Sequence, residues 1–152
     1  MDWEAAGAIG EILGAMGVIV TLAYLASQIR QNTRAMHSQS AQSLAEAGAA
    51  MNAMIIEDAD VARIFRTGLS KYQELSGDDR LRFRFLIGQW MLAYESVYVQ
   101  HKLGTIDRQI FDARMNNLRL WLSTEGGSRA WEVGKEVFSQ EYVKYVEQNV
   151  LQ

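Results

Sequence analysis

Few residues in this 152-residue chain have side chains suited to chemistry. Cysteine is absent, and the histidines are two, His37 and His101. Without cysteine the chain has no thiolate nucleophile and no thiolate metal ligand. Neither histidine has a second histidine or a glutamate at the spacing that helical zinc and di-iron motifs require. The sequence therefore predicts no metal site and no cofactor, and His101, on an apolar helical stripe, is expected in a core or at a helix end.

His37 has one spacing that is used in catalysis elsewhere. Six residues separate Arg30 from His37. This spacing resembles the Arg-x(4–6)-His motif of HEPN-type ribonucleases, in which motifs from two chains position and protonate a scissile phosphodiester. The resemblance implies a membrane-tethered ribonuclease or effector as one alternative function. Both residues directly follow a long apolar stretch and are better explained as charged anchors on a solvated face, so the sequence favours no enzyme and no catalytic residue.

Glu11 is the other candidate, because it is the one ionisable side chain in the apolar stretch from Ala5 to Ile29. Ionisable residues inside a membrane are costly and usually functional. Copies of Glu11 from several chains would form a carboxylate ring that faces a pore or a polar cavity. The alternative is that the hydrocarbon region begins at Ile12, which leaves Glu11 among the lipid headgroups.

The apolar stretch has the length of a membrane span. The 18 residues from Ile12 to Ile29 carry no charge. They extend about 27 Å as a helix, and all 25 residues extend about 37 Å, against a bilayer core of about 30 Å. Glycines are costly in water-soluble helices, whereas in membranes they allow helices to approach closely. We predict a transmembrane helix over residues 1–29; a soluble helix buried by association and an interfacial helix are the alternatives.

The flanking charges predict the orientation of this helix. Asp2 and Glu4 precede it, whereas Arg30 and Arg34 follow it. The positive-inside rule then places the N-terminus outside and the remainder in the cytoplasm, with Arg30 and Arg34 at the inner interface. Trp3 suits the outer interface as an aromatic anchor. The acidic start is untypical of a signal peptide.

Small residues in the stretch predict contact between helices. Ala6, Gly10 and Gly14 repeat every four residues, and Gly7 and Gly17 add further small positions. Ridges of this kind permit close helix packing in lipid. Two small faces would suit a ring in which each helix touches two neighbours. We therefore expect a homo-oligomer, with the lipid bilayer and other copies of the chain as partners.

The remainder of the chain predicts a helical domain over residues 30–152. No strong helix breaker occurs before Asp58, so one helix is expected from near Asp2 to near Glu57, about 80 Å long. Such a helix is too long for a compact monomer and implies packing against copies. Further helices are expected at 60–74 with Asp60 as N-cap, 77–102, 107–123, around 130–137 after a break at Gly126-Gly127, and from Ser139 to about 150. The helix at 77–102 is apolar on two faces and is therefore expected at the centre of its bundle.

Charge excludes one class of partner. The chain has 15 basic and 18 acidic residues, a net charge of -3. Three acids lie before the first basic residue, and the remaining acids balance the basic residues. This distribution argues against a basic nucleic-acid-binding surface.

Several segments resemble those of a family of short bacterial proteins with an N-terminal membrane helix. They are WEAAGAIGEILGA at 3–15, YLASQIRQNTRA at 24–35, GTID at 104–107, RAW at 129–131 and FSQEYV at 138–143. The resemblance implies a bacterial inner-membrane protein and carries no enzymatic activity. Together these observations predict an all-α, homo-oligomeric, single-pass membrane protein that acts as a pore, channel or membrane scaffold. The other alternative is a soluble helical binding module whose first helix is buried by oligomerisation.

Overall fold

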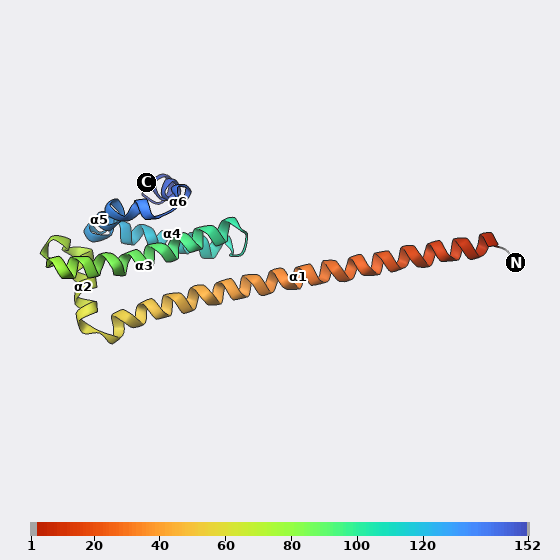
Figure 1. Ribbon diagram of the computed structural model, residues 1–152, viewed down its shortest axis with the longest axis horizontal. Coiled ribbons are helices and arrows are strands. Elements are labelled where there is room, and N and C mark those ends of the chain that lie inside the picture. Colours follow the sequence, from red (N-terminus) through yellow and green to blue (C-terminus); the bar gives the residue numbers. More distant parts are fainter. Residues whose placement is uncertain (1–2, 152) are drawn as a thin grey trace. The chain divides into compact units, whose positions relative to one another are not determined.

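The computed structural model describes residues 3–151, and of Ala5 and Ala6 it describes the backbone alone. Over these residues the regular elements are helices (Figure 1). In chain order they are α1 (Trp3–Glu57), α2 (Ala59–Ser70), the 3-10 helix η1 (Tyr72–Glu74), α3 (Gly77–Lys102), α4 (Arg108–Leu122), α5 (Glu125–Gly134), the 3-10 helix η2 (Lys135–Val137) and α6 (Gln140–Asn149). The predicted all-α fold, with a long N-terminal helix followed by a helical bundle, is confirmed.

The chain divides into two compact units, Met1–Ser38 and Gln39–Gln152. The described part of the first unit is helical throughout and belongs to α1. The second unit contains the end of α1 and all the later helices. The predicted boundary between residues 29 and 30 refers to a membrane surface and stays a prediction.

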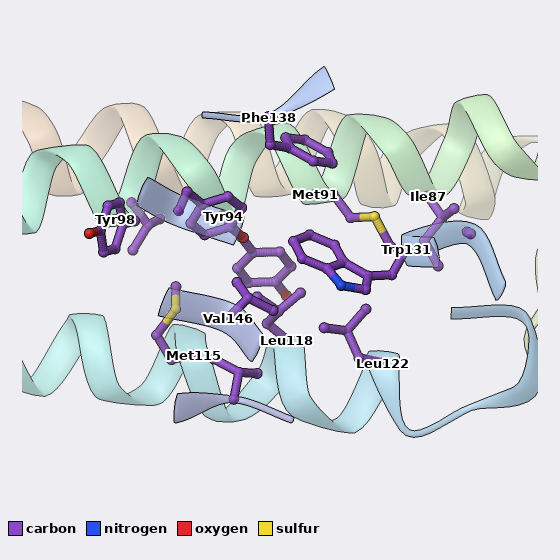
Figure 2. Close-up of a cluster of buried hydrophobic side chains, with 14 of the residues drawn as sticks. Ile87, Met91, Tyr94, Tyr98, Met115, Leu118, Leu122, Trp131, Phe138 and Val146 are labelled. Atoms are coloured by element: carbon purple, nitrogen blue, oxygen red, sulfur yellow. The ribbon is translucent and has the colours of Figure 1, made fainter. Parts of the chain in front are cut away.

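The core of the second unit is built on one face of α3. This face carries buried side chains at three- and four-residue intervals, and α4 has a buried face with the same spacing. Trp131 of α5 lies among side chains of α3, α4 and α6 and is almost fully buried (Figure 2). Tyr142 and Val146 of α6 are fully buried as well. Burying one aromatic or large aliphatic side chain contributes about 1.5–3 kcal/mol, so this cluster holds the helices of the second unit together.

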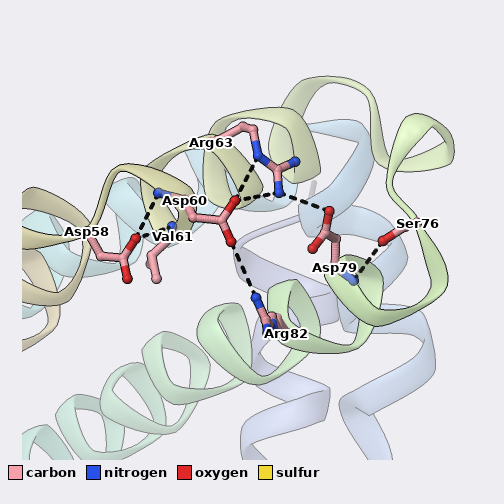
Figure 3. A network of polar contacts seen from close by, with 7 residues as sticks. All are labelled: Asp58, Asp60, Val61, Arg63, Ser76, Asp79 and Arg82. Atoms are coloured by element: carbon pink, nitrogen blue, oxygen red, sulfur yellow. Dashed lines mark hydrogen bonds and ion pairs between the residues drawn. The ribbon is translucent and has the colours of Figure 1, made fainter.

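Asp58 is the N-cap of α2. Its carboxylate accepts hydrogen bonds from the backbone N–H groups of Asp60 at 2.8 Å and Val61 at 3.2 Å (Figure 3). The prediction that Asp60 caps this helix is therefore wrong. Asp60 lies in the first turn and forms ion pairs with Arg63 and Arg82. Asp58 is extended, which frees its side chain to reach the first turn, whereas Asp60 is already helical.

The ends of α3 agree with the sequence. The Ser76 hydroxyl accepts a hydrogen bond from the backbone N–H of Asp79 at 3.1 Å and thereby caps the start of the helix. The helix closes at Gly104, whose φ of 68° favours glycine.

The second apolar face of α3 is exposed. Phe85, Leu92 and Val99 are 68%, 45% and 43% exposed, so the expectation of a helix surrounded on both faces is wrong.

The end of α6 is held by a side chain from α4. The Arg119 guanidinium donates to the backbone carbonyls of Asn149 and Val150, each at 2.9 Å. The last carbonyls of a helix lack partners within the helix. Arg119 therefore supplies donors that α6 itself does not have.

Gly126 and Gly127 do not interrupt the chain, and the predicted break is wrong. Both are buried within the first turn of α5, where the Thr124 hydroxyl accepts from the Gly127 N–H at 3.0 Å. A Cβ atom on Gly126 would lie 1.8 Å from the carbonyl oxygen of Gly68 in α2. The glycine is needed because the backbones of α2 and α5 touch at this point.

Replacing this glycine should destabilise the second unit. In Gly126→Ala the added methyl group must displace backbone, so we expect a loss of about 2–3 kcal/mol in the free energy of unfolding. Gly134→Ala is the matched control, because a Cβ there meets nothing within 4 Å. Chemical denaturation of both variants measures the difference, and an unchanged midpoint for Gly126→Ala would contradict the close contact.

Candidate functional site

The N-terminal part of α1 exposes a large apolar surface. An 18-residue window of this helix has a mean hydropathy of 1.9, and none of the window is buried. The exposed side chains include Ile9, Ile12, Leu13, Met16, Val18, Ile19, Val20, Leu22, Leu25 and Ile29. Soluble monomers rarely expose apolar patches of more than a few hundred Å². The helix is long and apolar enough to cross a membrane, and its surface calls for contact with lipid or with a partner.

One face of α1 differs from the rest of this surface. Spacings of three and four residues alternate along it, so its members line up on a single side of the helix. The face consists of Gly7, Gly10, Gly14, Gly17, Thr21, Tyr24 and Gln28, and we call it the glycine–polar stripe. The helix places all four glycines on this one face instead of the two that the sequence analysis expected. Each of these glycines has open space where a Cβ would stand.

The polar members of the stripe bond to their own helix. The Thr21 hydroxyl donates to the backbone carbonyl of Gly17 at 2.8 Å, and the Gln28 amide donates to the Tyr24 hydroxyl at 3.0 Å. Unsatisfied polar groups are costly in hydrocarbon, so these bonds reduce the cost of placing the stripe in a membrane. Thr21, Tyr24 and Gln28 were not predicted as members of the stripe, although their seven-residue register with the glycines indicates it.

Glu11 borders the glycine–polar stripe. It follows Gly7 by four residues and precedes Gly14 by three, and it is exposed. The structure therefore brings the carboxylate and the glycines to neighbouring positions on one helix. The side chain of Ala6, which was predicted to join the ridge, lies outside the described residues.

The predicted interface residues lie on either side of the apolar window. Trp3 is exposed near the start of α1, and Arg30 and Arg34 are exposed after Ile29. His37 lies further along the same helix and is half-buried. Arg30 and His37 are about 10 Å apart along the helix axis. Their proposed ribonuclease chemistry needs a second motif from another chain and stays a prediction.

The second unit has an apolar groove that the sequence analysis did not predict. It lies between α3 and the segment formed by α5 and η2, and its volume is about 300 Å³. Its walls include Phe85, Gly88, Leu92, Gly134 and Val137. The sequence indicated the apolar face of α3, but it did not indicate that α5 and η2 would leave that face open.

The ionisable groups of the second unit serve packing. Burial raises the pKa of Tyr94 to about 12, and its hydroxyl donates to the Asn117 amide oxygen. Burial also raises the pKa of Tyr142. The His101 ring, half-buried near the end of α3, stacks on Phe111 with centroids 4.0 Å apart. Among residues 3–151, no group of three potential metal ligands comes together.

Comparison of the chain with protein-family models, with curated proteins and with solved structures finds no match. The expected relation to bacterial proteins with an N-terminal membrane helix therefore stays a prediction. The exposed surfaces of α1 and α3 carry the functional argument.

Charges introduced into the apolar window should remove the protein from membranes. The double variant Ile19→Arg, Leu22→Arg places two cations at the centre of the window, at about 3 kcal/mol each on insertion scales. We expect the wild-type protein to stay in the pellet after alkaline carbonate extraction and this variant to leave it. Gln31→Arg, Met36→Arg is the control, because it adds the same charge beyond the window. Recovery of wild-type protein as a soluble monomer without detergent would contradict the membrane assignment.

Proposed function

We propose that this protein is a homo-oligomeric, single-pass membrane scaffold without enzymatic activity. The observation that carries the proposal is the glycine–polar stripe on an otherwise apolar and exposed α1. Large aliphatic side chains on the other faces suit lipid. The stripe suits another helix, because glycine lets two backbones approach within packing distance.

Self-association is supported by what drives helix contacts in lipid. Lipid tails are as apolar as leucine, so contact between helices depends on close packing and on polar groups. The stripe supplies both, with glycines in its first half and Thr21, Tyr24 and Gln28 in its second half. Copies inserted in the same direction bring identical stripes to the same depth. A symmetric, parallel association of α1 helices follows.

The charges support one orientation in a bacterial inner membrane. Arg30 and Arg34 would lie in the cytoplasm, and the N-terminus with Trp3 would lie outside. Residues 30–152 then form the cytoplasmic part of the scaffold. Many charged groups of the second unit pair with one another, among them Lys135 with Glu132 and Glu147. These ion pairs neutralise charge on the surface of the bundle.

Enlarging the glycines should weaken the assembly. In Gly10→Leu and Gly14→Leu a bulky side chain separates backbones that would otherwise touch, so we expect a smaller particle mass in mild detergent. Light scattering after size exclusion measures that mass. Ala15→Leu is the control, because Ala15 lies beside the stripe and not within it. An oligomer of unchanged mass in both glycine variants would place the contact elsewhere, for instance in residues 31–57.

A pore is the second candidate, and the position of Glu11 beside the stripe favours it. If the stripes form the contacts between neighbouring helices of a ring in which Glu11 faces the common axis, several carboxylates lie close together there and favour cations over anions. We expect cation-selective conductance in reconstituted bilayers, a loss of selectivity in Glu11→Gln, and an intact oligomer in that variant. Absence of conductance, or equal selectivity in Glu11→Gln, would leave the scaffold as the function and Glu11 as an interfacial residue.

A further inference from the structure

The exposed face of α3 follows a seven-residue repeat. Its positions are spaced alternately by four and three residues, as in helices that pack against another helix. They are Leu81, Phe85, Gly88, Leu92, Glu95 and Val99, which we call the α3 seam. Leu81 is 52% exposed and Phe85 is 68% exposed. The seam positions from Leu81 to Leu92 carry no charge, so this part of the seam has the composition of a contact surface and not of a solvated face.

The α3 seam combines a protrusion with a depression. Phe85 stands between two grooves, the groove of about 300 Å³ toward α5 and η2 and a more open one of about 510 Å³ toward Val61 of α2. Gly88 lies one turn further along the seam, and a Cβ there would meet nothing within 4 Å. The face therefore presents a large ring next to an open position.

We propose that a second copy of this chain occupies the α3 seam, with the two α3 helices antiparallel about a two-fold axis. In this register Phe85 of each copy packs over Gly88 of the other. Leu81 of each copy packs against Leu92 of the other. A surface that carries both protrusion and depression is self-complementary, which is the property that an isologous interface requires.

The available area is sufficient for such a contact. Leu81, Phe85 and Leu92 are joined at the rim by Val137, which is also exposed. Together these side chains offer on the order of 400 Å² per copy. A standard interface buries about 800 Å² on each partner, so the apolar centre is present and polar atoms at the rim complete it.

Packing favours the antiparallel arrangement. In a parallel pair Phe85 would meet Phe85 and Gly88 would meet Gly88, which crowds one layer and leaves a void in the other. In the antiparallel register each Phe85 ring meets the open position at Gly88 instead.

This contact lies within the second unit and does not depend on the proposed membrane association of α1. The seam and the walls of the groove toward α5 and η2 all belong to residues 81–138. The two self-contacts are therefore separable by mutation.

Cysteine cross-linking tests both the occupant and the register, because the natural chain has no cysteine. Full-length Leu81→Cys and Leu92→Cys proteins are reconstituted together in lipid vesicles and treated with a short bis-maleimide. We expect cross-linked heterodimers from the mixture and at least tenfold less product from either protein alone. The result should persist when both proteins also carry Gly14→Leu, so failure of the stripe contact does not imitate failure of the seam.

Two further variants keep the test decisive. Phe85→Asp, added to both cysteine proteins, should reduce the heterodimer at least tenfold. Leu120→Asp is the matched control, because Leu120 of α4 is 66% exposed and lies outside the seam, and it should leave the product unchanged. Strong self-cross-linking of Leu81→Cys alone would overturn the antiparallel register. Absence of product in every mixture would overturn the second copy as occupant, and the face would then belong to lipid or to a different protein.

Discussion

The apolar surface of α1 has to be covered, and the interpretation of the whole protein depends on this constraint. The window is free of charge from Ile12 to Ile29, and none of it is buried. The hydrophobic effect acts on every one of these side chains at about 25 cal/mol per Å². Lipid covers the aliphatic faces well but gains little from glycine, and so the same constraint separates the faces that suit lipid from the stripe that suits another helix.

The core of the second unit is built from side chains of that unit. Trp131, Tyr142 and the inner face of α3 form one continuous core, and Gly126 brings the backbones of α2 and α5 into contact. Close packing of this kind fixes the positions of α5 and η2 beside α3. The groove along the α3 seam is a consequence, because Gly88 and Gly134 place no side chain in the space between these elements.

Much of this fold was predictable from periodicity, because apolar residues at three- and four-residue intervals mark a helix wherever its core lies. The bounds of α3 follow from the residues at its ends, Ser76 as the N-cap and Gly104 just after the last turn. Gly126-Gly127 was misjudged because sequence cannot tell a glycine that ends a helix from one that lets two backbones touch. The outer face of α3 was misjudged for a related reason: an apolar face indicates that something covers it, but not whether the cover belongs to the same chain. At the candidate site, the sequence indicated the glycines and Glu11, whereas their common face with Thr21 and Gln28 required the continuous helix.

The contacts of Arg119 bear on how the molecule opens. The end of a helix usually frays because its last carbonyls have no hydrogen-bond donor within the helix. Such ends are where local unfolding and proteolysis begin. Here α4 supplies the donors to Asn149 and Val150. Fraying of the last turn of α6 therefore has to break these two bonds to α4 as well. The C-terminal turn is thereby tied to a helix that belongs to the core of the bundle, which raises the free energy of its local opening.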